Sequence, residues 1–224
     1  MKIFIKILFY FFSIVTITGC SSVNLSERIA PGYSEALLSV SRAIFGYKSE
    51  PFSKELIYQI PYASMTTKIG KGPEGLMILE SVRDKKELWI SADKIYFTLL
   101  NGRIISTKGL ENNLSNLETS YEVNDLSKLN VSLNYKHYYS FDNPEVHYLE
   151  VEVSYKNLGS ELVDLFDRKI KLNLIEEELH NKYLGWKVKN RFWYDSEGFI
   201  WKSEQHLSPK LPMIKIEVTK KPSM

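Results

Sequence analysis

The residues with the clearest chemistry lie near the start of the chain, at Ile17-Thr18-Gly19-Cys20. They follow a cationic start and the apolar run Ile7–Val15, which is too short to span a bilayer comfortably. A short apolar segment with a small residue before the cut is typical of a secretory signal peptide. The Cys20 thiol could be alkylated to a thioether-linked diacylglycerol, and Gly19 suits a peptidase that accepts only a small side chain. The sequence therefore predicts a cleaved signal peptide at 1–19 and lipidation of Cys20.

This lipobox predicts a location. Several acyl chains on Cys20 would hold the protein on a membrane, because each buried methylene adds about 0.8 kcal/mol. The residue after the cysteine is Ser21, whereas Asp at that place retains lipoproteins at the inner membrane in enteric-type bacteria. We therefore expect an outer-membrane lipoprotein whose globular part lies in the periplasm. Residues 20–32, mostly polar, would form the tether.

Other motifs point away from catalysis. Gly70-x-Gly72-x-x-Gly75 matches the dinucleotide fingerprint, but Pro73 removes an amide donor and a β-rich run follows, so a glycine-rich turn is the better interpretation. No Gly-x-Ser-x-Gly motif is present, and a lipidated Cys20 cannot serve as a nucleophile. We predict no catalytic residue and no cofactor.

The histidines and carboxylates give equally weak signals. None of the four histidines has a paired metal-ligand spacing, although His137 and His147 could face each other across a turn. A polar pair on a sheet surface is the simpler interpretation, and we predict no metal. The glutamates 176–178 are expected at the solvated end of a strand, and the separation of paired carboxylates is a tertiary property.

The sharper candidate is a row of aromatic side chains. Tyr135, His137, Tyr139 and Phe141 alternate along one strand and would point the same way. Aromatic rings stack on the apolar faces of sugars, so an exposed row would form a candidate glycan-binding site. Burial of the same row in the core explains the pattern equally simply, since aromatic residues dominate packing. The tryptophans near the C-terminus are expected in the core.

Composition limits the class of protein. The chain has 29 basic and 27 acidic residues, and removing Lys2 and Lys6 with the signal peptide makes the mature chain formally neutral. A nucleic-acid partner is therefore not expected. About two hundred residues can bury the core of one domain, which we place at 33–224. A rich aromatic supply favours strands over helices.

The order of elements predicts a mainly β fold. One helix is expected at 34–45, where apolar residues recur at helical spacing after Ser34. Short β-rich runs follow, the first of them at 55–60. Residues 110–117 could form one or two helical turns. Asn101-Gly102 and Asp195–Gly198 are expected to be hairpin turns, and residues 213–219 a closing strand. We predict a single domain built as an antiparallel β-barrel or β-sandwich.

Several stretches together resemble the YjbF-type group 4 capsule polysaccharide lipoprotein family. The most specific are Asn190-Arg191-Phe192-Trp193-Tyr194-Asp195 and Gly198-Phe199-Ile200-Trp201-Lys202-Ser203, and the others are 61–65, 70–73, 89–93, 101–104, 107–110 and 207–212. The resemblance implies a barrel-like domain with an N-terminal helix, encoded beside machinery for capsule or exopolysaccharide export. It carries no catalytic motif to this chain.

These observations lead to one expectation and two alternatives. We expect a non-enzymatic lipoprotein that assists assembly or export of a surface polysaccharide. It would bind the membrane through the acyl chains on Cys20, and would bind the polysaccharide or an export protein. The alternatives are a polysaccharide-modifying hydrolase with carboxylates from the central strands, and a structural lipoprotein that docks the export complex.

Overall fold

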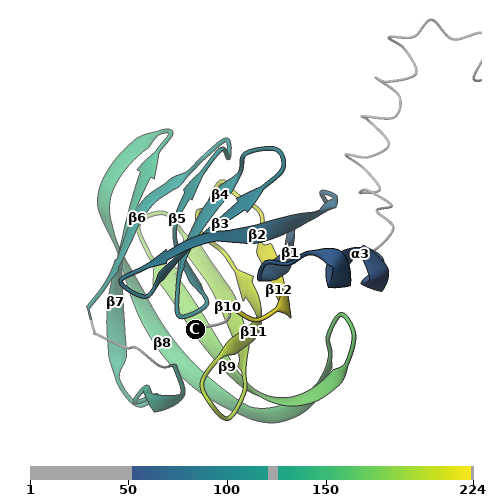
Figure 1. Ribbon diagram of the computed structural model, residues 1–224. Helices are drawn as coiled ribbons and strands as arrows, with labels where there is room; N and C mark the ends of the chain where they lie inside the picture. Colours follow the sequence, from purple (N-terminus) through teal and green to yellow (C-terminus); the bar gives the residue numbers. More distant parts are fainter. Residues whose placement is uncertain (1–51, 121–125, 223–224) are drawn as a thin grey trace, which may run out of the picture. The chain divides into compact units, whose positions relative to one another are not determined.

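Twelve antiparallel strands form one sheet that curves into a nearly closed barrel (Figure 1). In this computed structural model, residues 52–120 and 126–222 are described, without the side chain of residue 127. The first half of the sheet contains β1 (Ser64–Ile69), β2 (Glu74–Arg83), β3 (Lys86–Ser91), β4 (Tyr96–Leu100), β5 (Arg103–Lys108) and β6 (Leu114–Thr119). The second half contains β7 (Asn134–Asp142), β8 (Glu145–Asp164), β9 (Lys169–Asn181), β10 (Trp186–Tyr194), β11 (Ile200–Gln205) and β12 (Ile214–Lys220). A short helix, α3 (Lys54–Gln59), precedes β1, and a 3₁₀ turn, η2 (Leu126–Lys128), precedes β7.

The strands follow one another as an up-and-down meander, and the first strand, β1, pairs with the last, β12. This pairing places residues near the start and the end of the domain side by side, as in Thr66 opposite Glu217. The predicted closing strand is confirmed.

The sheet is interrupted between its two edge strands, β5 and β6, which still contact each other. At this interruption, side-chain oxygens accept hydrogen bonds from backbone N–H groups that would otherwise pair with a neighbouring strand. The Leu114 amide donates to Thr107 Oγ1 at 2.9 Å, and the Ile104 amide donates to Gln205 Oε1 at 3.0 Å. We call this interruption the seam.

Alternation of side chains separates a buried interior from a solvated exterior, as expected for strands with one wet face. In β10, for example, Asn190 and Phe192 are buried whereas Lys189 and Arg191 are exposed. Large aromatic side chains fill the interior, and Trp89, Phe97 and Phe192 are almost inaccessible. The Trp residues expected in the core are buried.

The β8–β9 hairpin extends beyond its neighbours and curls back toward β12 and α3 (Figure 1). A bulge between Asn157 and Gly159 interrupts its register. At its tip, Asp167 accepts a hydrogen bond from the Tyr58 hydroxyl of α3 at 2.9 Å. The tip is therefore fixed against the helix that precedes the barrel.

Turn chemistry predicted two hairpins correctly. Asn101-Gly102 joins β4 to β5, with φ of 49° and 73°, and Gly198 has φ of 85° in the turn between β10 and β11. A Cβ at Gly102 would lie 2.4 Å from Ile200 Cβ, so close packing also requires a residue without a side chain at this position.

Three local predictions were wrong. Residues 55–60, expected as a β-rich run, form most of α3, because Ser53 caps the helix and accepts the Leu56 amide at 3.2 Å. Residues 110–117, expected as helical turns, lead into and form part of β6. The glutamates 176–178 lie within β9 and not at its end.

The predicted signal peptide at 1–19, Cys20, the tether at 20–32 and the helix at 34–45 lie outside the described residues. Within the described part of the chain, no helix is long and apolar enough to cross a lipid bilayer.

Candidate functional site

The predicted glycan-binding row lies on β7 and points into the barrel. His137 is 0%, Tyr139 1% and Phe141 4% exposed, while Tyr135 is half-buried. The two interpretations of this row, an exposed glycan-binding site or part of the core, both placed the four side chains on one face. The structure places that face inside the barrel. A glycan chain outside the barrel therefore cannot stack on these three buried rings.

Ring packing explains this burial. Tyr139 stacks on Phe141 with centroids 6.1 Å apart and meets Trp186 of β10 edge to face at 5.7 Å. Tyr135 contacts Tyr155 of β8 edge to face at 5.7 Å. Such pairs contribute about 0.5–1.5 kcal/mol beyond area burial, so the row stabilises the barrel.

A buried ion pair lies deeper in the same interior. Arg103, the first residue of β5, donates from Nη1 to Glu177 Oε2 at 2.9 Å, and its Nη2 lies 2.8 Å from Oε1. The Tyr155 hydroxyl donates to Glu177 Oε1 at 2.6 Å. Glu177 is completely buried, and a bidentate guanidinium and a hydroxyl replace the water that its charge has lost.

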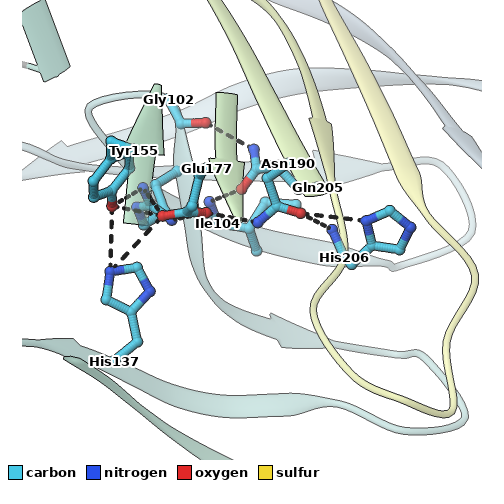
Figure 2. A network of polar contacts seen from close by, with 9 residues as sticks. Gly102, Ile104, His137, Tyr155, Glu177, Asn190, Gln205 and His206 are labelled. Atoms are coloured by element: carbon cyan, nitrogen blue, oxygen red, sulfur yellow. Dashed lines mark hydrogen bonds and ion pairs between the residues drawn. The ribbon is translucent and has the colours of Figure 1, made fainter. Parts of the chain in front are cut away.

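The network continues through amide side chains (Figure 2). Asn190 Nδ2 donates to Glu177 Oε2 at 2.7 Å, and its Oδ1 accepts the His206 amide at 2.7 Å. Gln205 Nε2 donates to the Gly102 carbonyl at 2.9 Å, and Gln205 Oε1 accepts a hydrogen bond from the Ile104 amide. The tip of the β4–β5 hairpin is thus held against β9, β10 and β11.

His137 borders the ion pair without joining it as a cation. Burial lowers the pKa of His137 to about 3, with Glu177 opposing and Arg103 adding to the decrease. The imidazole is therefore neutral at ordinary pH, although its Nε2 lies 3.8 Å from Glu177 Oε1. Burial alone would raise the pKa of Glu177. The charge of Arg103, the neighbouring His137 and the hydrogen bonds from Arg103 and Tyr155 together outweigh burial and hold the pKa of this carboxyl well below its usual range.

This arrangement suits a structural role. A glycosidase acid must keep its proton near neutral pH and reach the sugar oxygen. Glu177 is ionised and has no access to solvent, and His137 is likewise buried. The network can fix the hairpin tip to β9 and β11 across the interior, but it offers no proton to an external substrate.

The neighbouring glutamate lies on the other face of the sheet, although it too is only 7% exposed. Glu176 points outward, where Lys189 Nζ donates to it at 2.7 Å and Arg191 Nε at 3.2 Å. These donors lower its pKa, first through the Lys189 hydrogen bond. Lys187 with Glu178 and Lys215 with Glu204 continue this exterior ladder of ion pairs.

The histidines are not brought together. His137 pairs with Val151 across β7 and β8, whereas His147 is exposed and bonded to Glu145 at 3.0 Å. The described residues contain no group of three or more His, Cys, Asp or Glu side chains placed to hold a metal ion.

The comparisons with known proteins assign the chain to a family. A family model described as "Group 4 capsule polysaccharide lipoprotein gfcB, YjbF" matches residues 38–219, most of the chain. The chain belongs to this capsule polysaccharide lipoprotein family. The resemblance seen in the sequence is confirmed.

Two lipoproteins of Escherichia coli (strain K12) are similar along most of their length. The chain is 24% identical to the uncharacterized lipoprotein YjbF over 173 residues, which cover 74% of this chain and 78% of YjbF. It is 23% identical to the uncharacterized lipoprotein GfcB over 197 residues, which cover 83% of this chain and 88% of GfcB.

The crystal structure of the hypothetical lipoprotein YmcC from Escherichia coli (K12) has the same fold. The TM-score is 0.68 at 18% identity, and the match covers 92% of this chain and all of the YmcC chain. This likeness supports the barrel and says nothing of a ligand.

Proposed function

We propose that the protein is a non-enzymatic, outer-membrane lipoprotein that assists assembly or export of a capsular or exopolysaccharide. It acts by binding the polysaccharide or a protein of the export complex, while acyl chains on Cys20 hold it at the membrane. Membership of the capsule polysaccharide lipoprotein family across residues 38–219 is the observation that carries this proposal.

The environment of the carboxylates supports the non-enzymatic part. Glu177 is buried and paired with Arg103, and Glu176 is held ionised by Lys189 and Arg191. The central strands thus place these two carboxylates on opposite faces of the sheet, not around a common substrate. A hydrolase built on this pair is not favoured.

A genetic experiment tests the role in assembly or export. Cells lacking the gene should retain less polysaccharide on the surface, measured by immunoblotting of surface and whole-cell fractions. Wild-type protein should restore the surface fraction, whereas Cys20→Ala should not. Unchanged surface polysaccharide in the deletion strain contradicts the proposal.

A biochemical experiment tests the absence of hydrolysis. The full chain in detergent is incubated with polysaccharide purified from the same cells, and chain length is followed by size-exclusion chromatography. We expect no shortening. Shortening by wild type that Glu177→Gln abolishes would instead establish a hydrolase.

A further inference from the structure

A hollow of about 450 Å³ lies beside Trp201, near the curled β8–β9 hairpin. Its volume falls within the range of about 300–1,000 Å³ that is usual for ligand pockets. The lining residues come from β8, the β8–β9 turn, β9, the β10–β11 turn and β11, and they include Arg168, Lys171, Asn173, Asp195 and Trp201. We call it the Trp201 hollow.

The indole in the wall is rigidly held. Arg168 lies over the Trp201 ring at 4.8 Å from its centroid, and Phe199 meets the same ring edge to face at 5.0 Å. The indole N–H donates to Asp195 Oδ2 at 2.8 Å. Trp201 is 9% exposed, so the ring forms a fixed part of the wall, and its indole N–H already has a partner.

Two cationic side chains of the hollow, Arg168 and Lys171, have nitrogen atoms available to bind an anion. Arg168 bonds Asp167 through Nε at 3.0 Å, and no hydrogen bond of its two terminal nitrogens is recorded within residues 52–120 and 126–222. Lys171 has no ion pair among those same residues. The lysines of the exterior ladder differ, since Lys187 and Lys189 are both paired with glutamates.

The acids beside the hollow already have partners. Asp195 Oδ1 accepts the amides of Glu197 and Phe199 at 2.9 and 3.0 Å, and its Oδ2 accepts the indole N–H of Trp201. Asp167 is paired with Arg168, so Asp167 and Asp195 formally balance the charges of Arg168 and Lys171. Anion binding at the hollow therefore depends on the Lys171 ammonium and the terminal nitrogens of Arg168 and not on an excess of positive charge.

Polar groups complete the lining. Ser160, Asn173 and Ser196 line the hollow, and within the described part of the chain no side-chain hydrogen bond is recorded for them. Two hydroxyls and one amide are thus available to ligand hydroxyls. Hydroxyl and amide groups without side-chain partners, beside cationic nitrogens that bind no acid, match a ligand rich in hydroxyls that carries carboxylates.

We propose that the Trp201 hollow binds a segment of acidic polysaccharide, with Arg168 and Lys171 on its carboxylates and Asn173 on its hydroxyls. This inference rests on the proposed function, because it names the ligand of a binding lipoprotein. An acidic peptide could satisfy the same cations and hydrogen-bonding groups, and membership of the capsule polysaccharide lipoprotein family favours the polysaccharide. Affinity at a single hollow is weak, and repetition along a polymer increases it.

Binding by charge-altered variants tests this inference. The full chain in detergent micelles is titrated calorimetrically with a galacturonic acid hexasaccharide and, in parallel, with neutral maltohexaose. The variants are Arg168→Gln and Lys171→Gln, each removing one positive charge. Lys187→Gln is the matched control, because it removes the same charge from the exterior ladder. Thermal midpoints verify that each variant is folded.

Wild type and Lys187→Gln should bind the acidic hexasaccharide equally, and each hollow variant should bind it about tenfold more weakly, as for loss of a charge-assisted hydrogen bond. Maltohexaose should bind more weakly than the acidic sugar. Equal binding by wild type and both hollow variants overturns the inference, and so does absence of binding by wild type. Equal affinity for both sugars overturns the assignment of an acidic ligand.

The inference and the proposed function fail in different ways. Loss of surface polysaccharide in the deletion strain without sugar binding at the hollow overturns only the inference. Sugar binding that depends on Lys171, combined with unchanged surface polysaccharide in the deletion strain, overturns the role in assembly or export.

Discussion

Arg103 Nη2 lies 2.8 Å from Glu177 Oε1, and these two buried groups belong to strands on opposite sides of the seam. Arg103 begins the edge strand β5, while Glu177 lies in the middle of β9. The ion pair therefore ties the start of the edge strand β5 to β9 across the interior. At the seam itself, between β5 and β6, the Leu114 amide donates to Thr107 Oγ1.

Removing the cation of this pair should destabilise the protein strongly. Arg103→Met leaves the Glu177 carboxylate buried without its counter-charge, which costs about 3–5 kcal/mol. Urea unfolding followed by tryptophan fluorescence measures this loss. Lys136→Met is the control, because the Lys136–Glu150 pair is exposed on both sides and such surface pairs contribute little to stability. Equal losses for the two variants would contradict the structural role of the buried pair.

Acid should destabilise the fold through His137. The unfolded chain binds this proton near pH 6.5, whereas the folded protein resists it until the pKa of about 3. The unfolded state therefore holds more protons within that window, and stability decreases as pH falls through it, by at most about 1.4 kcal/mol per pH unit from this group. Urea unfolding at a series of pH values measures the slope.

The His137→Gln variant isolates this contribution. Between pH 6.5 and 4.5 its stability should depend less on pH than that of wild type, because Glu177 adds its own loss only as pH falls below its ordinary value of 4.5. Burial also lowers the pKa of His206, so a residual slope remains. Identical slopes for variant and wild type would mean that His137 is not buried in its neutral form.

Position 102 should tolerate no side chain. Gly102→Ala forces a positive φ on alanine and places its Cβ 2.4 Å from Ile200 Cβ, so both strain and overpacking oppose folding. We expect a loss of about 2 kcal/mol or more in urea unfolding. Gly185→Ala is the control, since it shares a positive φ but has no atom within 4 Å of the new Cβ. A smaller loss for Gly102→Ala than for Gly185→Ala would contradict the close packing.

Local chemistry predicted the turns because turns depend on neighbouring residues. Asn101-Gly102 needs positive φ at both positions, and this preference is visible in the sequence. The short helix α3 was missed because six residues are too few to show helical periodicity, although four of them favour helices. Ser53 as an N-cap and Glu55 in the first turn were the local signals.

The interior of the site could be predicted only in part. Alternation placed Tyr135, His137, Tyr139 and Phe141 on one face, but which face is buried depends on closure of the sheet. The same alternation could have shown that Glu177 must face opposite to Glu176. Its partner Arg103 is 74 residues away in the sequence, and no local pattern joins them.

Truncation of Trp201 should weaken the C-terminal hairpin. The ring is 9% exposed, carries Arg168 and Phe199 against it, and donates to Asp195. Trp201→Ala should therefore lower the free energy of unfolding by about 3–5 kcal/mol. Tyr183→Ala is the control, because this ring is 85% exposed and its loss should stay within about 0.5 kcal/mol. A thermal midpoint for Trp201→Ala within about one degree of wild type would contradict the burial, since 1 kcal/mol corresponds to several degrees in a domain of this size.

The anchor is tested by removing the one cysteine of the chain. Acylation requires the Cys20 thiol, so Cys20→Ala should accumulate as a precursor that takes up no labelled palmitate. Ser22→Ala lies two residues on and leaves the lipobox intact, and it should be processed and labelled like wild type. Sucrose-gradient fractionation should place wild type and Ser22→Ala in the outer membrane, because Ser21 is no retention signal. Palmitate in Cys20→Ala, or none in wild type, would contradict lipidation at Cys20, and labelled wild type in the inner membrane would contradict the sorting alone.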